Sequence, residues 1–576
     1  MNKKLTKYVG KYKKYVILTP LCVMAQCIME LAIPFIMAKM IDVGIRGTGG
    51  INYTIMMGLA MTLIAILSLT FGVLGARYAA LASSGYAKNL RSALFNKIQK
   101  FSFANIDKFQ TSSLVTRLTN DVNNAQTSFM MSIRMFIRAL TMLIGASVMA
   151  ILINKKLSLV FLVAMPILAF TLYLIASKAH PKFGIMLKNL DNLNLDVQEN
   201  LAGIRVVKSF VREDYEIDKF DRNADLLKKS QVAAEKIIIL NGPVMQIIMN
   251  ASSVAIMYFG GIMIMHQTFE IGSLSSLLSY VTQVLISLMM LSAVFMMMVI
   301  SKSSRERIIE VLDEEIDIKD NKSNLKLEDG SIEFKNVTFS YKNSKPILKD
   351  INLKINSGET IGIIGSTGSS KSSLVSLIPR LFDTKEGEVI VGRHNVKEYS
   401  LDNLRKDVSM VLQNNVLFSG TIKENLKWGD KDATEKEITQ ACKNACIDDF
   451  IKTLKDGYDT DLSQGGVNLS GGQKQRLCIA RALLKKPKIL ILDDSTSAVD
   501  TKTDALIRKA FKEEIPDTTK IIIAQRVNSV QDADKIIVMD GGKVSGFGTH
   551  EELLKTNEIY REVYELQTKG SDSDGK

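Results

Sequence analysis

The run Gly365-Ser366-Thr367-Gly368-Ser369-Ser370-Lys371-Ser372 has the residue types of a loop that holds phosphate groups. An apolar run before it predicts a buried strand, and the residues after it, beginning with Ser373, predict a helix. In that setting, backbone N–H groups point at anionic oxygens near the positive end of the helix. Lys371 is expected to reach the outer phosphates, and Ser372 is expected to ligate Mg²⁺. The usual pattern of such a loop is G-x-x-x-x-G-K-[ST]. Ser370 stands where this pattern has its second glycine, so the match is one residue short.

Two carboxylates follow a second apolar run, 489–492, which predicts another buried strand. A phosphate-loop ATPase uses one carboxylate to hold Mg²⁺, often through water, and Asp493 is predicted to fill this role. A second group orients or deprotonates the attacking water, and Asp494 stands in that place. Together with the loop, this pair predicts a site that binds ATP with Mg²⁺.

A second anion site is predicted later in the same domain, where Ser-Gly-Gly-Gln precedes a helical run. Ser470 is a good N-cap, and the glycines after it leave the helix N-terminus open to close approach. One domain rarely needs two such sites for one nucleotide. The sequence therefore predicts that this site closes over a nucleotide held by another copy, through Ser470, Gly471, Gly472 and Gln473.

These residues come after a long apolar half of the chain. Hydrophobic residues make up 47% of the sequence, and its mean hydropathy is +0.11. Most of the apolar segments have enough uncharged residues to cross a bilayer core. Glu30 interrupts the first segment, and it is predicted either to serve function or to sit in a wet interior cavity for structural reasons. The six segments lie near residues 15–43, 51–76, 132–154, 157–177, 237–265 and 271–301.

The net charge of +13 is explained by membrane topology. With the N-terminus inside, the three inside segments hold six, seven and eleven Lys and Arg residues, whereas the opposite loops hold one, two and none. This asymmetry predicts a multi-pass protein of the cell membrane, in contact with the lipid bilayer, with both termini and the ATPase domain cytoplasmic. The location of the charge argues against a nucleic-acid partner, and no cleavable signal peptide is expected.

The expected fold class is a multi-domain membrane protein, with an all-α domain of six transmembrane helices followed by an α/β phosphate-loop domain. Two turns, near 104–116 and 202–211, are predicted to lie farthest from the membrane and to contact a cytoplasmic domain. The predicted boundaries are 1–14 for an amphipathic elbow on the membrane surface, 15–310 for the transmembrane domain with long intracellular extensions, 311–329 for a linker, 330–567 for the nucleotide-binding domain and 568–576 for a disordered tail.

Residues 470–473 are called the Ser470 motif below. Taken together, the phosphate loop, the Ser470 motif and the run 489–494 resemble an ATP-binding cassette (ABC) transporter. Six spans ahead of the cassette on one chain resemble a half-transporter of the type I (type IV) exporter class. The resemblance covers nearly the whole chain. It implies that two cassettes sandwich two ATP molecules, each between the phosphate loop of one chain and the Ser470 motif of the other.

The resemblance also implies roles for single residues. Tyr341 resembles the aromatic residue that stacks on adenine, and Gln413 resembles the glutamine that senses Mg²⁺ and the membrane domain. Residues 465–468 resemble the stretch that precedes the Ser470 motif in exporters. Residues 497–500 resemble the loop that crosses the dimer interface. The implied metal set is Ser372, Gln413 and Asp493.

Three residues depart from the pattern of active family members. Ser370 replaces a glycine of the phosphate loop, Asp494 stands where active members carry glutamate, and Gln525 stands where they carry histidine. Aspartate is one methylene shorter than glutamate, and glutamine cannot titrate. Asp494 and Gln525 are therefore predicted to be degenerate catalytic positions, at a site that binds ATP but hydrolyses it slowly.

These departures favour a subunit of a heterodimeric, multidrug-type exporter of a bacterial cell membrane. Its partners are expected to be a second, non-identical half-transporter chain, which carries the main catalytic base, and a hydrophobic or amphiphilic small-molecule substrate. Two alternatives stay open. The first is a homodimeric lipid or lipopeptide flippase, and the second is a non-transporting membrane regulator switched by ATP binding.

Overall fold

The computed structural model describes all residues except 1–2, 48, 342–343, 496 and 574–576. The chain divides into two compact units. The first comprises Met1–Gln99 and Ser112–Glu314, and the second comprises Lys100–Thr111 and Glu315–Lys576. The second unit thus includes residues 100–111, which the sequence-based boundaries place within the transmembrane domain.

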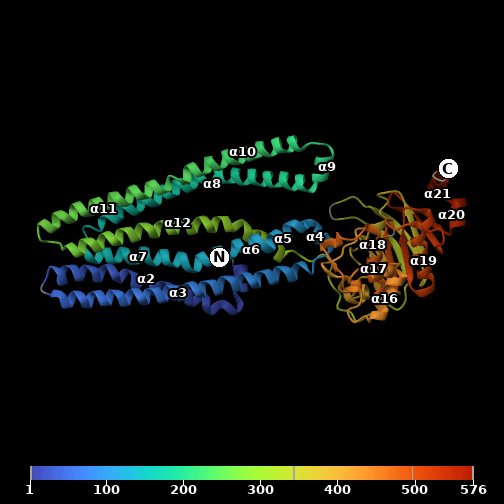
Figure 1. Cartoon of the computed structure of the whole chain (residues 1–576), viewed down its shortest axis with the longest axis horizontal. Helices are drawn as coiled ribbons and strands as arrows, with labels where there is room; N and C mark the ends of the chain where they lie inside the picture. Colours follow the sequence, from blue (N-terminus) through green and yellow to red (C-terminus); the bar gives the residue numbers. More distant parts are fainter. Residues whose placement is uncertain (1–2, 48, 342–343, 496, 574–576) are drawn as a thin grey trace. The chain divides into compact units, whose positions relative to one another are not determined.

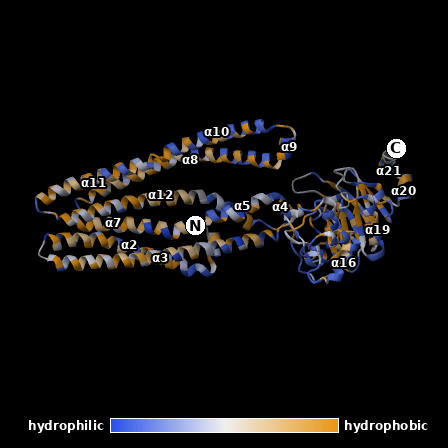
Figure 2. Ribbon diagram, in the orientation of Figure 1, coloured by the Kyte–Doolittle hydropathy of each residue, from blue (hydrophilic) through white to orange (hydrophobic). Residues whose placement is uncertain are grey.

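The first unit is built from helices that are apolar over lengths sufficient to cross a membrane (Figure 2). Within the described residues there are six such helices, as predicted, and all of them extend well beyond the roughly 20 residues that a bilayer core requires. The six spans are Lys4–Ile45, Gly50–Ile98, Thr111–Ile153, Val163–Ala202, Glu213–Met265 and Ile271–Asp313.

Figure 1 shows these long helices lying along one another. The N-terminal segment packs against α3 (Gly50–Ile98), because Leu5 and Val9 are buried and the Asn89 side chain donates a 2.9 Å hydrogen bond to the Tyr8 carbonyl. The remaining elements of this unit are α1 (Lys3–Thr6), η1 (Lys7–Tyr12), α2 (Lys13–Lys39), η2 (Met40–Ile45), α5 (Thr111–Thr116), η3 (Arg117–Asp121), α6 (Val122–Met131), η4 (Ser132–Phe136), α7 (Ile137–Ile153), α8 (Leu159–Ala202), α9 (Ile204–Ser209), α10 (Glu213–Ile238), α11 (Asn241–Met265) and α12 (Ile271–Asp313).

Glu30 has a partner that the sequence did not reveal. Arg138 of α7 donates a 2.8 Å hydrogen bond to one carboxylate oxygen of Glu30, and Gln26 donates to the other oxygen at 2.9 Å. A charge inside an apolar span is costly unless it is paired. The pair therefore gives Glu30 a structural role in joining α2 to α7.

A long hairpin of α8 and α10, connected by α9, forms part of the first unit (Figure 1). Asn189 of α8 donates a 3.1 Å hydrogen bond to Ser230 of α10, and Lys219 lies 3.1 Å from the Asp196 carboxylate. At the end of the hairpin, Phe210 is 73% exposed. The hairpin is thus held together by contacts between its own two helices.

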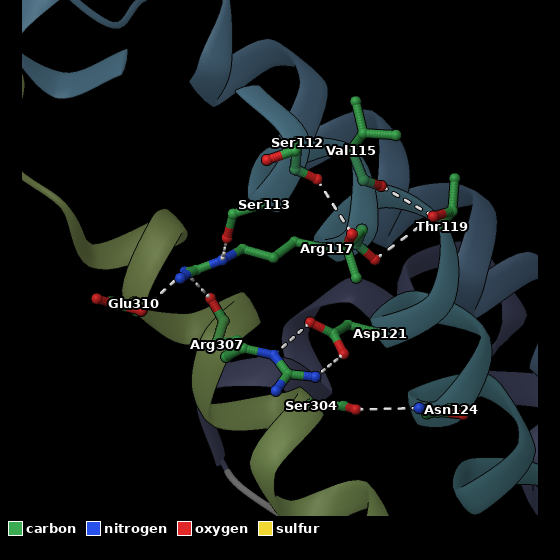
Figure 3. Close-up of polar contacts among 11 residues, drawn as sticks. Ser112, Ser113, Val115, Arg117, Thr119, Asp121, Asn124, Ser304, Arg307 and Glu310 are labelled. Atoms are coloured by element: carbon green, nitrogen blue, oxygen red, sulfur yellow. Dashed lines mark hydrogen bonds and ion pairs between the residues drawn. The ribbon is translucent and has the colours of Figure 1, made fainter. Parts of the chain in front are cut away.

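Two ion pairs, each with one buried partner, join η3 to the end of α12 (Figure 3). Arg307 donates through its guanidinium to both carboxylate oxygens of Asp121, at 2.7 Å from Nε to Oδ2. Arg117 donates to the Glu310 carboxylate and to the Arg307 carbonyl, each at 2.8 Å. The network fixes the π-helical turn η3 against the last turns of α12.

The second unit contains an α/β domain with a six-stranded sheet in the order β12-β11-β3-β10-β9-β6. Strands β11, β3, β10, β9 and β6 are parallel, and β12 pairs antiparallel to β11 at one edge. Their bounds are β3 Thr360–Gly365, β6 Val408–Val411, β9 Ile489–Asp493, β10 Thr519–Ile523, β11 Lys535–Asp540 and β12 Lys543–Gly548. All five residues of β9 and of β10 are buried, as expected for central parallel strands.

A four-stranded antiparallel sheet, β2-β1-β4-β5, and a two-stranded sheet, β7-β8, complete the strands described in this unit. The other elements are β1 (Ile332–Phe339), β2 (Leu348–Ile355), α13 (Lys371–Ser376), β4 (Glu386–Val391), β5 (His394–Asn395), α14 (Leu401–Asp407), β7 (Gly420–Thr421), α15 (Ile422–Leu426), α16 (Glu435–Asn444), α17 (Asp448–Thr453), η5 (Gly457–Asp459), β8 (Asp461–Leu462), η6 (Gln464–Gly466), α18 (Gly471–Leu484), α19 (Thr501–Glu514), η7 (Val527–Ser529), α20 (His550–Thr556) and α21 (Glu558–Ser573). Helix α21 extends into the segment predicted to be a disordered tail, whose last three residues lie outside the described residues.

Helix α4 (Phe103–Phe109) belongs to the second unit, although it lies between the second and third spans in sequence. The Asn105 side chain donates to the Glu315 carbonyl at 3.0 Å and accepts from the Asp317 N–H at 3.3 Å. The Phe103 ring lies 6.0 Å from the ring of Phe382. One of the two turns predicted to contact a cytoplasmic domain thus packs on the α/β domain.

The Asp121–Arg307 pair generates a stability prediction, because its two partners are unequally buried. The side chain of Asp121 is 1% exposed, whereas that of Arg307 is 47% exposed. Arg307→Ala leaves a buried carboxylate without its cation and is expected to destabilise the protein by on the order of 3 kcal/mol. Asp121→Asn removes the buried charge itself and is expected to cost less.

The measurement is the apparent melting temperature of the purified chain in detergent, from size-exclusion chromatography after heating. Lys302→Ala is the control, because Lys302 and Glu306 are both exposed and lie 4.0 Å apart. Equal losses for Arg307→Ala and Lys302→Ala would contradict a stabilising role for the pair.

Candidate nucleotide-binding site

The predicted site residues converge because they follow the carboxyl ends of neighbouring parallel strands. The phosphate loop follows β3, Asp494 follows β9, Gln525 follows β10 and Gln413 follows β6. The register pairs Ile523 of β10 with Asp493 of β9 and with Ile363 of β3, so these strands end at the same edge. Ligands bind at this edge in open α/β sheets.

The loop from Gly365 to Ser370 adopts the backbone path that the glycine pattern requires. Ser370 takes the left-handed conformation, with φ 70° and ψ 26°, directly before α13. A residue with a Cβ atom adopts this conformation at a cost of roughly 1–2 kcal/mol. Gly365 is needed for space, because a Cβ there would lie 2.2 Å from the Met539 carbonyl oxygen. Ser370 therefore adopts the left-handed conformation that a glycine would adopt without strain.

The ammonium group of Lys371 lies over this loop. It donates hydrogen bonds to the carbonyls of Gly365, at 2.8 Å, and Ser366, at 2.9 Å, and lies 3.3 Å from the Ser369 hydroxyl. Burial lowers the pKa of Lys371, and the negative charges of Asp494 and Asp493 partly offset this effect. The lysine is thus placed at the loop, close to two carboxylates.

Ser372 and Asp493 are in direct contact, since the serine hydroxyl donates to the Asp493 carboxylate at 2.9 Å. Burial raises the pKa of Asp493, the Ser372 hydrogen bond lowers it, and the charge of Asp494 raises it further. A hydroxyl and a carboxylate at this distance can share one hard cation. The described residues contain no group of three His, Cys, Asp or Glu side chains that could hold a metal ion by themselves. Phosphate oxygens and water therefore have to supply the other ligands.

Asp494 is held by two amide side chains. Gln525 donates to its Oδ2 at 2.7 Å, and Gln413 donates to the same oxygen at 3.3 Å. Burial raises the pKa of Asp494, and the hydrogen bonds from Gln525 and Gln413 oppose that rise. The backbone of Asp494 has a φ of 48°, so its side chain leaves the strand end in an uncommon direction. The structure thus brings both predicted degenerate positions together.

Tyr341 lies beside the phosphate loop and is 39% exposed. Its hydroxyl is 3.0 Å from the hydroxyl of Ser373 on α13, and its ring meets those of Phe339 and Phe382 edge-on, each at 5.1 Å. An aromatic ring anchored in this way has the rigidity needed for base stacking. Phe382 is a member of this cluster that the sequence analysis missed, because no motif marks it.

The Ser470 motif forms the N-terminus of α18. Ser470 and Gln473 make a reciprocal capping box: the Ser470 N–H donates to the Gln473 side chain at 2.8 Å, and the Gln473 N–H donates to the Ser470 hydroxyl at 3.3 Å. Gly472 is required for packing, because a Cβ there would lie 2.7 Å from the Ala498 carbonyl oxygen. Gly471 is exposed.

Gln475 connects this helix to the predicted interface loop, 497–500. Its side chain donates to the Ser497 hydroxyl at 3.3 Å and accepts from the Ala498 N–H at 3.1 Å. The sequence analysis did not identify Gln475, although the polar residue stands one turn after the cap. Among the described residues, no hydrogen bond joins residues 470–473 to the phosphate loop of the same chain. Within one chain, the predicted anion site at Ser470 is thus not hydrogen-bonded to the predicted anion site at the phosphate loop.

Comparison with known proteins agrees with this geometry. The model for the ABC transporter transmembrane region matches residues 16–301, and the ABC transporter model matches residues 348–497. The uncharacterized ABC transporter ATP-binding protein YfiB of Bacillus subtilis is 37% identical over 94% of this chain and 95% of its own length. A fatty acid ABC transporter ATP-binding/permease protein of Mycobacterium bovis is 31% identical over 82% of this chain and 75% of its own.

A solved structure of a bacterial Atm1-family ABC exporter with ATP bound superposes with a TM-score of 0.84 at 25% identity. The match covers 96% of this chain and 99% of that chain. Both the membrane spans and the α/β domain are therefore shared. The chain belongs to the ABC transporter family, as an exporter that carries its transmembrane region and its ATPase domain on one polypeptide.

Proposed function

We propose that this chain is one subunit of a heterodimeric ABC exporter, and that its own nucleotide site binds ATP but hydrolyses it poorly. Its partner is a second, non-identical half-transporter chain that supplies the main catalytic base. The complex moves hydrophobic or amphiphilic compounds, such as drugs, out across the cell membrane. In this arrangement the ATPase domain and both termini are cytoplasmic.

The double hydrogen bond to one oxygen of Asp494 carries the proposal. Hydrogen bonds donated to a carboxylate stabilise its charged form and so lower its affinity for the proton of the attacking water. Oδ2 of Asp494 already accepts from the amides of Gln413 and Gln525. The aspartate is also shorter than the expected glutamate, and a misplacement of about 1 Å can reduce a rate on the order of 100-fold. These features support slow hydrolysis at this site.

The groups for binding Mg-ATP are nevertheless present. Lys371 supplies a positive charge beside the phosphate loop, and Tyr341 supplies an aromatic face. The hydroxyl of Ser372 and the carboxylate of Asp493, 2.9 Å apart, would hold Mg²⁺ together with phosphate oxygens, and Gln413 is the third proposed ligand. Bound Mg²⁺ would neutralise charge on the phosphates. The presence of these binding groups beside a short aspartate in the place of the base supports a degenerate site.

The intact Ser470 motif supports a role in trans. Its glycines and capping box leave the N-terminus of α18 open to an anion, and that N-terminus has no hydrogen bond to its own phosphate loop among the described residues. This chain can therefore complete a competent site on a partner while its own site stays slow. The relative named as a fatty acid transporter supports an amphiphilic substrate.

Lys371→Ala is expected to weaken nucleotide binding strongly, because the loop loses the cation that offsets the ATP phosphates. Tyr341→Ala is expected to weaken it less, since stacking on an aromatic ring is worth roughly 1–3 kcal/mol per base. Photolabelling with azido-ATP measures both effects. Lys431→Ala, an exposed lysine of the same unit, is the control. Unchanged labelling of Lys371→Ala would refute the assignment of the phosphate loop.

Ser470→Arg is expected to abolish most ATPase activity of the assembled pair. The side chain would fill the helix N-terminus that meets the partner's nucleotide, although Ser470 has no hydrogen bond to its own phosphate loop among the described residues. Steady-state phosphate release measures the effect. Gln440→Arg, which adds the same cation on exposed α16, is the matched control. Near-normal turnover in Ser470→Arg would show that the motif does not act in trans.

The chain purified alone is expected to hydrolyse ATP very slowly, because two copies would build two sites with a poor base. In the co-purified pair, Asp494→Asn is expected to reduce turnover only modestly. Replacement of the partner's catalytic glutamate by glutamine is expected to reduce it nearly to zero. If Asp494→Asn removes activity as fully as the partner change, the site is not degenerate and the proposal fails.

A further inference from the structure

The C-terminal helix α21 contacts the loop that carries Gln525. The side-chain amide of Gln567 donates a 2.9 Å hydrogen bond to the Gln525 carbonyl, and its oxygen accepts from the Val527 N–H at 2.8 Å. One side chain thus holds the backbone on both sides of Arg526. Gln567 stands 42 residues after Gln525 in the sequence and outside every motif of the nucleotide site.

The burial of Val527 shows why this contact matters. Val527 is fully buried and belongs to a hydrophobic core of the α/β domain. A buried backbone N–H needs a partner inside the protein, because water cannot reach it. Gln567 supplies that partner. The loop therefore cannot keep its path without Gln567 unless a buried polar group is left unpaired, which is unfavourable.

Helix α21 is anchored to the α/β domain, so it can hold the loop in place. Tyr560 is fully buried in the same core as Val527, and its hydroxyl lies 2.6 Å from Nδ1 of His550. Just before the helix, the Asn557 side chain accepts from the Tyr560 N–H at 2.9 Å and donates to the Ser545 carbonyl at 3.1 Å. The packing of the core thus determines where α21 presents its last turns.

The other end of the loop is held as well. The Ser529 hydroxyl donates to one carboxylate oxygen of Asp504 on α19 at 3.1 Å, and Arg508 lies 3.4 Å from the same oxygen. The segment from Gln525 to Ser529 is therefore fixed by α21 at its start and by α19 at its end. From the loop held in this way, the Gln525 amide reaches Asp494 at 2.7 Å.

We propose that Gln567 is a positioning residue of the nucleotide site. By pairing with the backbone at Gln525 and Val527, it fixes the direction from which the Gln525 amide meets Asp494. The inference rests on the proposed function, in which Asp494 and Gln525 stand at the catalytic positions of a slow site. Because small displacements of catalytic groups change rates strongly, loss of Gln567 alters turnover at this site rather than the affinity for ATP.

The test uses the co-purified complex in which the partner's catalytic glutamate is replaced by glutamine, so that turnover reports the site of this chain. Hydrolysis as a function of ATP concentration gives kcat and KM. Gln567→Leu and Gln525→Ala are expected to change kcat by the same factor, at least about threefold and in the same direction, with KM within about twofold of the unchanged chain. The double variant is expected to show no further change, because Gln567 acts through Gln525.

Two truncations form a matched pair. Ending the chain after Leu566 removes Gln567, whereas ending it after Thr568 keeps it, and both keep the buried Tyr560. The shorter chain is expected to reproduce the kcat of Gln567→Leu, and the longer one the kcat of the unchanged chain. Amide hydrogen exchange at Val527 is a second readout, which depends neither on the partner nor on the rate of hydrolysis. It is expected to speed up at least about tenfold in Gln567→Leu and in the shorter chain, but not in the longer one.

Several results would overturn the proposal: additive effects of Gln567→Leu and Gln525→Ala on kcat, an unchanged kcat in either single variant, equal behaviour of the two truncations, or unchanged exchange at Val527 in Gln567→Leu. A fast rate at this site in the unchanged chain would refute the proposed slow site. It would leave the assignment of Gln567 in place, since that assignment depends on the ratios between variants.

Discussion

The nucleotide site depends on one constraint, the shared carboxyl edge of the parallel sheet. Because β3, β9, β10 and β6 run in the same direction, the residues that follow them meet at one place. The phosphate loop, Asp493 and Gln525 lie far apart in sequence, yet none of them needs a long loop to reach the others. The buried strands β9 and β10 fix the position of this edge, so the packing of the core determines the geometry of the site.

Within that edge, the chemistry is set by a balance of charge and hydrogen bonding. Lys371 lies near two carboxylates. Burial lowers the pKa of Lys371 and raises the pKa of Asp493 and of Asp494, and each shift favours the neutral form of the group. Asp493 accepts a hydrogen bond from the Ser372 hydroxyl, with which it can share a cation. Asp494 accepts hydrogen bonds from the side-chain amides of Gln413 and Gln525. The two neighbouring aspartates therefore differ in their partners: Asp493 is placed to hold a cation together with Ser372, and the hydrogen bonds to Asp494 oppose the rise of its pKa.

The first unit meets the opposite problem, since its helices are apolar and must bury the charges that remain. Glu30 is paired with Arg138 inside the spans, and Asp121 is paired with Arg307 where α12 ends. These two ion pairs thus join neighbouring helices of the first unit and fix their positions along one another.

The sequence by itself determined the six spans, the α/β class and the motif residues, because hydrophobic length, strand patterning and the glycine-lysine-serine spacing are local properties. It also located Ser370, Asp494 and Gln525 as departures. Only the tertiary structure decided that both Gln413 and Gln525 donate to one oxygen of Asp494. Local patterns cannot predict such contacts, because they depend on strand order and on the direction in which each side chain leaves the sheet. For the same reason the partner of Glu30 and the place of Phe382 beside Tyr341 emerged only when distant helices and strands were packed together.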